Sequence, residues 1–69
     1  MDIKKIGMNI RAERRRQEIS QEKLGEMVNL STNSINMIEK GKQIPNAVNL
    51  YLIAKALNTN INNLYQGIE

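Results

Sequence analysis

The chain has 69 residues, carries a net charge of +3 and contains neither cysteine nor histidine. A chain of this length forms one domain at most, so we expect a single domain over residues 1–69. The missing cysteine excludes thiolate chemistry, and the missing histidine removes the commonest metal ligand and general base. We therefore expect no enzyme activity, metal, cofactor or small-molecule ligand. No apolar run approaches the roughly 20 residues that span a membrane, and no signal peptide is evident, so we expect a cytoplasmic protein.

The basic residues are concentrated at one end of the chain. Residues 1–16 hold six basic and two acidic side chains, whereas residues 45–69 hold one of each. A basic end joined to a neutral end indicates a polyanion partner on one side of the molecule. An ordinary solvated surface has a similar composition, so the charge alone does not decide between these two interpretations.

The first segment has the apolar spacing of a helix. Ile3, Ile6, Ile10 and then Arg14 recur at steps of three and four residues, which predicts one helix face. Asp2 precedes this stripe as a candidate N-cap. The three consecutive arginines at the far end suit a helix C-terminus, where the dipole favours cations.

Two serines eleven residues apart predict the next two helices. An apolar residue precedes Ser20 and Ser31, and another follows each of them four residues later. This arrangement is a capped helix start with a hydrophobic staple. It predicts short helices over residues 21–28 and 32–40, joined by a tight turn in which Asn29 adopts the left-handed conformation that often ends a helix.

The helix expected over residues 21–28 has a small apolar face. We expect Leu24, Met27 and Val28 to face the core. Gly25 lies in the middle of this helix, where glycine costs roughly 0.5–1 kcal/mol relative to alanine. We expect another backbone to approach closely there.

The remaining chain predicts two more helices. Gly41 ends the helix that starts after Ser31, Asn46 caps a fourth helix that stops near Asn58, and Asn60 caps a short fifth helix. The apolar positions of these last three helices are Ile35, Ile38, Leu50, Ile53, Ala54, Leu57, Ile61, Leu64 and Tyr65. The expected fold class is all-α, a compact bundle of five helices without strands.

Two short helices joined by a three-residue turn form a helix-turn-helix. The residues that carry a closer resemblance are Ile19-Ser20-Gln21-Glu22-Lys23-Leu24-Gly25-Glu26-Met27-Val28, Ser31 to Ile35, Ile38 to Lys42, and Pro45. This pattern resembles the phage-repressor and Cro-type helix-turn-helix family, the xenobiotic-response-element group. The resemblance implies a lambda-repressor-like DNA-binding domain. The family usually has alanine at Gly25, glycine at Asn29 and an acidic residue at Lys23.

The resemblance also implies which residues meet double-stranded DNA, because the third helix of such proteins lies in the major groove. The implied base-reading positions are Thr32, Asn33, Asn36 and Met37. The implied backbone-contacting or bracing positions are Gln21, Ser31, Ser34, Arg11, Arg15, Lys40 and Lys42. The base-reading set carries no charge, but asparagine can pair with adenine and the threonine methyl group can contact thymine. Affinity is therefore expected from the cations, through phosphate contacts.

Two further features concern structure and assembly. The resemblance pairs Arg14 with Glu39, and an ion pair there would tie the first helix to the end of the third. In the fourth helix, Val48 and Leu52 are expected on the side opposite the buried stripe, as a small exposed patch.

The expected function is a sequence-specific transcriptional regulator, a repressor or controller that binds a palindromic operator as a homodimer. Apolar side chains near the C-terminus that have no expected place in the core, together with the resemblance, predict where the two subunits of the homodimer meet. The predicted interface residues are Ile44, Ile61, Asn62 and Tyr65, with Ile68 nearby. The alternative is an antitoxin or another protein-interaction module whose main partner is a protein. The basic residues favour DNA, whereas the patch at Val48 and Leu52 favours a protein partner.

Overall fold

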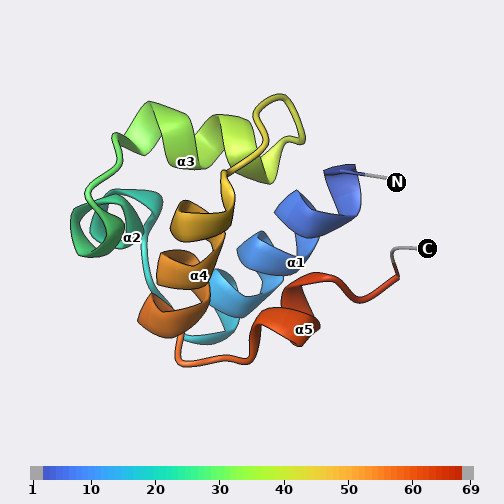
Figure 1. Ribbon diagram of the computed structural model, residues 1–69. Coiled ribbons are helices and arrows are strands. Elements are labelled where there is room, and N and C mark those ends of the chain that lie inside the picture. Colours follow the sequence, from blue (N-terminus) through green and yellow to red (C-terminus); the bar gives the residue numbers. More distant parts are fainter. Residues whose placement is uncertain (1–2, 68–69) are drawn as a thin grey trace.

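The computed structural model describes residues 3–67 of the protein. Its elements in chain order are α1 (Ile3–Arg16), α2 (Gln21–Val28), α3 (Thr32–Glu39), α4 (Ala47–Ala56) and α5 (Ile61–Leu64). The described residues contain no strand, so the predicted all-α class with five helices is confirmed (Figure 1). None of the helices within residues 3–67 is long and apolar enough to cross a membrane. The candidate cap Asp2 lies outside the described residues.

The helices begin where local capping chemistry starts them. Each cap accepts a hydrogen bond through its side-chain oxygen from a backbone N–H two or three residues further along, which satisfies a donor that the helix itself leaves free. The caps observed in this role are Ser20, Ser31, Asn46 and Asn60. All four predicted helix starts are thus confirmed.

The helix ends also follow the expected backbone conformations. Asn29 is left-handed, with φ 59° and ψ 44°, and makes the tight turn between α2 and α3. Gly41 and Asn58 have φ values of 75° and 52° and follow α3 and α4. The helix α3 ends at Glu39, one residue before the expected end. Glu18 is a further left-handed residue, which the sequence pattern did not indicate.

The core is formed by one cluster of aliphatic side chains from all five helices. Its members are Ile6, Ile10, Leu24, Val28, Ile35, Ile38, Leu50, Ile53, Ala54, Leu57 and Leu64. The stripe predicted on α4 is buried as expected. Burial of each large aliphatic side chain contributes roughly 1.5–3 kcal/mol, so this cluster is the main source of stability.

Two expectations about burial were wrong. Met27 is 45% exposed, because the buried face of α2 is formed by Leu24, Gly25 and Val28 instead. Leu52 is half-buried and packs against the core. The helix α4 is contacted by α2 and by α5, and packing from two sides widens its buried arc beyond the stripe that the sequence pattern shows.

The expected close approach at Gly25 is present. A Cβ atom on Gly25 would lie 2.5 Å from the carbonyl oxygen of Leu30, far inside van der Waals contact. The missing side chain lets the turn after α2 fold back onto that helix. This contact sets how closely α3 follows α2.

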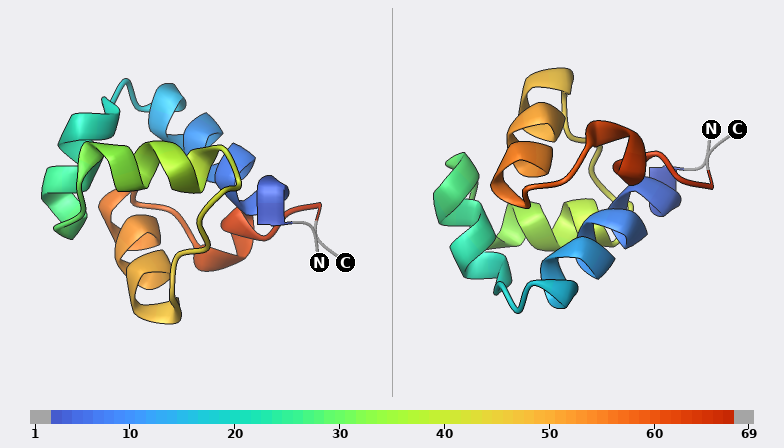
Figure 2. Two further views of the ribbon diagram at one scale, coloured as in Figure 1. Left: turned by 90° about the horizontal axis from the view of Figure 1, so that it is seen from above. Right: turned by 90° about the horizontal axis from the view of Figure 1, so that it is seen from below.

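The arrangement of the helices leaves α3 uncovered on its outer side. Figure 1 shows α3 along one edge of the molecule and α5 at the opposite edge. The two views of Figure 2 agree, since α3 lies in front when the molecule is seen from above and α5 lies in front when it is seen from below. A contact made through α5 would therefore leave the outer face of α3 free.

Candidate nucleic-acid interface

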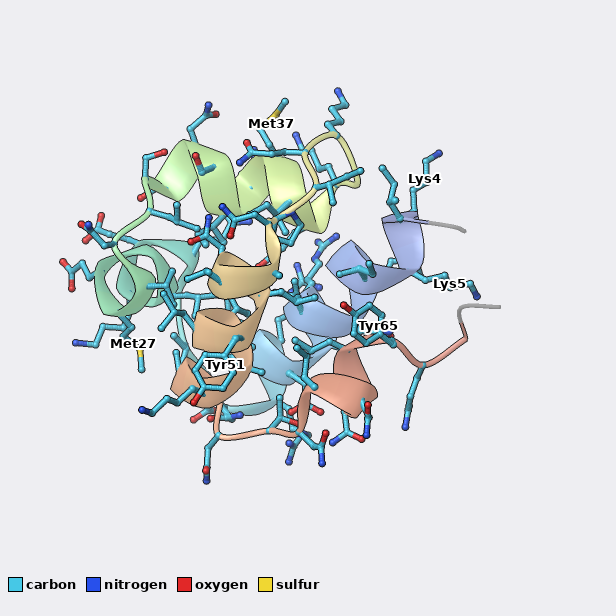
Figure 3. The ribbon with its side chains drawn as sticks, viewed as in Figure 1. Lys4, Lys5, Met27, Met37, Tyr51 and Tyr65 are labelled. Carbon is cyan, nitrogen blue, oxygen red and sulfur yellow. The ribbon has the colours of Figure 1, made fainter. Side chains whose placement is uncertain are left out.

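The helix α3 presents an uncharged surface of three polar residues and one methionine. Ile35 and Ile38 are buried, and this fixes which side of the helix faces outward. We call the four outward positions the α3 face, namely Thr32, Asn33, Asn36 and Met37. Thr32 and Asn33 are exposed, whereas Asn36 and Met37 are half-buried. Figure 3 shows the Met37 side chain directed away from the body of the molecule.

Cations border the α3 face. We call these residues the basic rim, namely Arg11, Arg15, Lys40 and Lys42, and all four are exposed. An open hollow of about 280 Å³ brings α1, α2 and α3 together. Its lining consists of Arg11, Arg14, Arg15, Gln21, Asn36, Glu39 and Lys40. Residues far apart in the sequence thus form one positively charged depression beside α3.

A buried ion pair between Arg14 and Glu39 forms part of the lining of this hollow. Arg14 Nε donates to Glu39 Oε2 at 2.6 Å, and the guanidinium Nη2 donates to Oε1 at 3.0 Å. The third nitrogen, Nη1, donates to the backbone oxygen of Ile19 at 2.7 Å. Hydrogen bonding to Glu39 raises the pKa of the Arg14 guanidinium above its ordinary value, although burial opposes this shift. Arg14 therefore connects α1, the loop before α2 and the end of α3.

Gln21 extends this network to the α3 face. Its amide nitrogen Nε2 donates to Glu39 Oε1 at 3.2 Å and lies 3.5 Å from Asn36 Oδ1. The contact with Asn36 agrees with the bracing position that the resemblance implies for Gln21. The second partner of Gln21, Glu39, was not expected from the sequence.

The serines at the start of α3 contact each other. The Ser31 hydroxyl accepts from the backbone N–H of Ser34 at 3.0 Å and donates to the Ser34 hydroxyl at 3.1 Å. Both residues keep one edge toward solvent at the helix start. Their position places backbone N–H groups and hydroxyls where an anion can approach the helix N-terminus.

Gly7 was missed by the sequence analysis although it carries the contact between α1 and α3. A Cβ atom there would lie 2.3 Å from the carbonyl oxygen of Ile38 and 2.7 Å from that of Glu39. A signal was present in the sequence, because Gly7 lies on the same stripe as Ile6 and Ile10. The glycine lets α1 rest directly on the last turn of α3.

The residues expected in a subunit contact come from two segments: Ile44 lies in the loop that follows α3, whereas the others belong to α5 and its end, at the edge of the molecule opposite α3 (Figure 1). Ile44 is 62% and Tyr65 38% exposed, and Asn62 is exposed as well. Ile61 is half-buried and packs against the core, so it offers less surface than expected. Ile68 lies outside the described residues.

Asn9 is a further residue that the sequence analysis missed. Its amide nitrogen donates to the backbone oxygens of Leu64 and Gln66, each at 2.9 Å. These two bonds fasten the end of α5 to α1 on both sides of Tyr65. Asn9, which precedes Leu64 by fifty-five residues in the sequence, therefore helps to hold the segment that carries Tyr65.

The chain matches a known protein family and a known repressor. Residues 10–64 match the family described as Helix-turn-helix (HTH_3). The chain is 36% identical over 67 residues to repressor protein C2 of Salmonella phage P22, and it spans about a third of that protein, 31% of its length.

Solved structures agree with this match. The P22 c2 repressor in complex with a synthetic operator has a TM-score of 0.83 and 37% identity, over 90% of this chain and 94% of that one. The restriction-modification controller protein C.AhdI from Aeromonas hydrophila has a TM-score of 0.87 and 28% identity, over 91% of this chain and 96% of that one. The sequence match and the shared arrangement of helices lead to the same conclusion: this chain belongs to the phage-repressor type of the helix-turn-helix family.

Proposed function

We propose that this protein is a transcriptional regulator of the cytoplasm that binds double-stranded DNA in a sequence-specific manner. The observation that carries the proposal is the uncharged, hydrogen-bonding α3 face with the basic rim along its border. Asparagine and threonine side chains can read base edges in the major groove, while exposed cations neutralise phosphates. The role requires binding and no catalytic step.

The relatives support this proposal. The P22 repressor was solved in complex with a synthetic operator, and C.AhdI is a restriction-modification controller. This chain resembles both over nearly its whole length. A repressor or a controller is accordingly the kind of regulator that we propose.

We further propose that the protein acts as a homodimer on a palindromic operator. The exposed side chains of Ile44, Asn62 and Tyr65 form the contact, with the accessible part of Ile61. Residues 43–67 carry a single charged side chain, Lys55, and depletion of charge is typical of the centre of a protein interface. Two-fold symmetry suits a DNA site with half-sites one helical turn apart, roughly 34 Å.

The experiment that tests the proposal is a selection of bound duplexes from a random library, followed by affinity measurements. We expect an enriched sequence with two symmetric half-sites, and roughly a thousandfold or greater preference for it over shuffled DNA at physiological salt. A library that yields no enriched sequence would contradict the proposed function.

A second candidate is a protein-interaction module such as an antitoxin. The observation that favours it is the exposure of Val48 and Tyr51 on α4, at 66% and 57%. If the selection fails while a protein partner is bound through α4, this second candidate replaces the first. Substitution of Val48 by aspartate would then abolish that partner's binding.

A further inference from the structure

Gln21, the first residue of α2, connects the buried ion pair to the α3 face. Its Nε2 atom lies 3.2 Å from Glu39 Oε1. Glu39 pairs with Arg14 as a carboxylate, and a carboxylate only accepts hydrogen bonds. The end of the Gln21 amide that faces Glu39 is therefore its NH₂ group. The neighbouring charge determines this orientation of an amide that could otherwise be turned by 180°.

The orientation of Gln21 determines that of Asn36 in turn. The NH₂ group of Gln21 has two hydrogens, and the second is directed at the Asn36 side chain, 3.5 Å away. Two NH₂ groups cannot hydrogen-bond to each other, so the Asn36 atom on this side is the oxygen Oδ1. The Nδ2 group of Asn36 donates to no other group among residues 3–67. Oδ1 keeps a second lone pair, but the contact with Gln21 holds this oxygen on the Gln21 side of the amide, while the Nδ2 donors remain available.

We call the contacts from Glu39 through Gln21 to Asn36 the Gln21 relay. We infer that the relay makes Asn36 donate hydrogen bonds to acceptor atoms on a base, with guanine as its preferred base. The inference rests on the proposed function, in which α3 lies in the major groove. Pairing with adenine requires both ends of an asparagine amide, because Oδ1 accepts from N6 while Nδ2 donates to N7. In Asn36 the Oδ1 atom is turned toward Gln21. The Nδ2 group is left to donate, and guanine offers two adjacent acceptors, O6 and N7.

Asn33 provides the matched comparison within the same helix. It is exposed, and its side chain makes no hydrogen bond with other described residues. Both ends of its amide are free, so Asn33 can pair with adenine in the usual two-bond geometry. The two asparagines carry the same side chain on the same helix, but only Asn36, which is also the less exposed of the two, is in contact with Gln21. Gln21 is accordingly a positioning residue for base recognition.

The test is a selection from random duplexes with the wild-type protein, Asn36→Ala, Asn33→Ala and Gln21→Ala. The base pair at which Asn36→Ala relaxes the preference identifies the position that Asn36 reads. There the wild type is expected to select guanine, by roughly 5- to 150-fold over adenine. Gln21→Ala is expected to reduce the guanine preference at that same base pair, toward adenine. The base pair relaxed by Asn33→Ala is expected to keep its preference in Gln21→Ala.

Three results would overturn the inference. They are adenine at the base pair read by Asn36 in the wild type, a selected site unchanged by Asn36→Ala, and a Gln21→Ala variant that binds all sequences more weakly without changing that base pair. Circular dichroism establishes whether Gln21→Ala is folded at the assay temperature. If it is not folded, the base selected by the wild type decides alone. Failure of the wild type to select any sequence counts instead against the proposed function.

Discussion

Arg14 on α1 and Glu39 at the end of α3 are twenty-five residues apart in the sequence, yet their side chains pair at 2.6 Å in the interior. Arg14 is 9% exposed and Glu39 5%. The pair joins the helix that supplies Arg11 and Arg15 to the helix that supplies the α3 face. It therefore holds the basic rim and the α3 face in a fixed position relative to each other.

Loss of either partner is expected to destabilise the protein strongly. Arg14→Ala leaves the buried Glu39 carboxylate without its counter-ion, which costs about 3–5 kcal/mol. The double variant with Glu39→Ala is expected to lose less than the sum of the two single variants, because the unpaired charge is then gone. Urea unfolding measures all three free energies.

The control for this prediction is Arg16→Ala. Arg16 pairs with Glu13 on the surface, and its side chain is 68% exposed. Such a pair contributes about 0–1 kcal/mol, so this variant should unfold close to the wild type. Strict additivity of Arg14→Ala and Glu39→Ala would mean that the two side chains are not coupled.

The helix starts could be predicted because capping is a local interaction. Ser20, Ser31, Asn46 and Asn60 each act within three residues, and the apolar period on α4 likewise needs no knowledge of the tertiary structure. Met27 could not be placed by the same means. Whether it or Gly25 faces the core depends on the turn at Leu30, which packs against α2.

Part of the network beside α3 was expected from the resemblance, which pairs Arg14 with Glu39 and makes Gln21 a bracing residue, but the contact between Gln21 and Glu39 was not expected. The resemblance indicated the residues of the α3 face and the basic rim. The path from Arg14 through Glu39 and Gln21 to Asn36 depends on how closely three helices approach one another. A periodicity in the sequence carries no information about such distances.

Gly7→Ala is expected to destabilise the protein although alanine favours helices. In an open helix this change stabilises by roughly 0.5–1 kcal/mol. Here the added Cβ would meet the backbone of Ile38 at 2.3 Å, so α1 and α3 must separate, which costs about 1–3 kcal/mol. Thermal unfolding followed by circular dichroism tests this. Met8→Ala, at a 59% exposed neighbour, is the control and should change stability by less than about 0.5 kcal/mol.

Lys42→Ala and Asn33→Ala are expected to weaken DNA binding in different ways. Lys42 belongs to the basic rim, so its loss should lower affinity for the selected and the shuffled duplex alike and reduce the salt slope by about 1. Asn33→Ala should lower affinity for the selected duplex alone, by about 1–3 kcal/mol. Fluorescence anisotropy across a salt series separates the two effects. Equal losses on both duplexes for Asn33→Ala would remove that residue from base reading.

Ile44→Asp is expected to dissociate the proposed dimer. The substitution places a charge in an apolar contact, and at 62% exposure it leaves the core of the subunit intact. Sedimentation velocity should show a monomer at concentrations where the wild type is a dimer. The control is Val48→Asp, at a 66% exposed position on α4, which should remain dimeric. If Ile44→Asp remained dimeric and Val48→Asp became monomeric, the subunit contact would lie on α4 instead.

The role of α3 can be tested by mapping the DNA contact on the protein itself. Backbone amide signals of the ¹⁵N-labelled protein can be followed by NMR during titration with the selected duplex. The largest shifts are expected at residues 31–37, at residues 40–42 and at the start of α2, with small shifts at residues 48–58. Shifts centred on α4, with α3 unaffected, would contradict the central claim that α3 is the DNA-reading element.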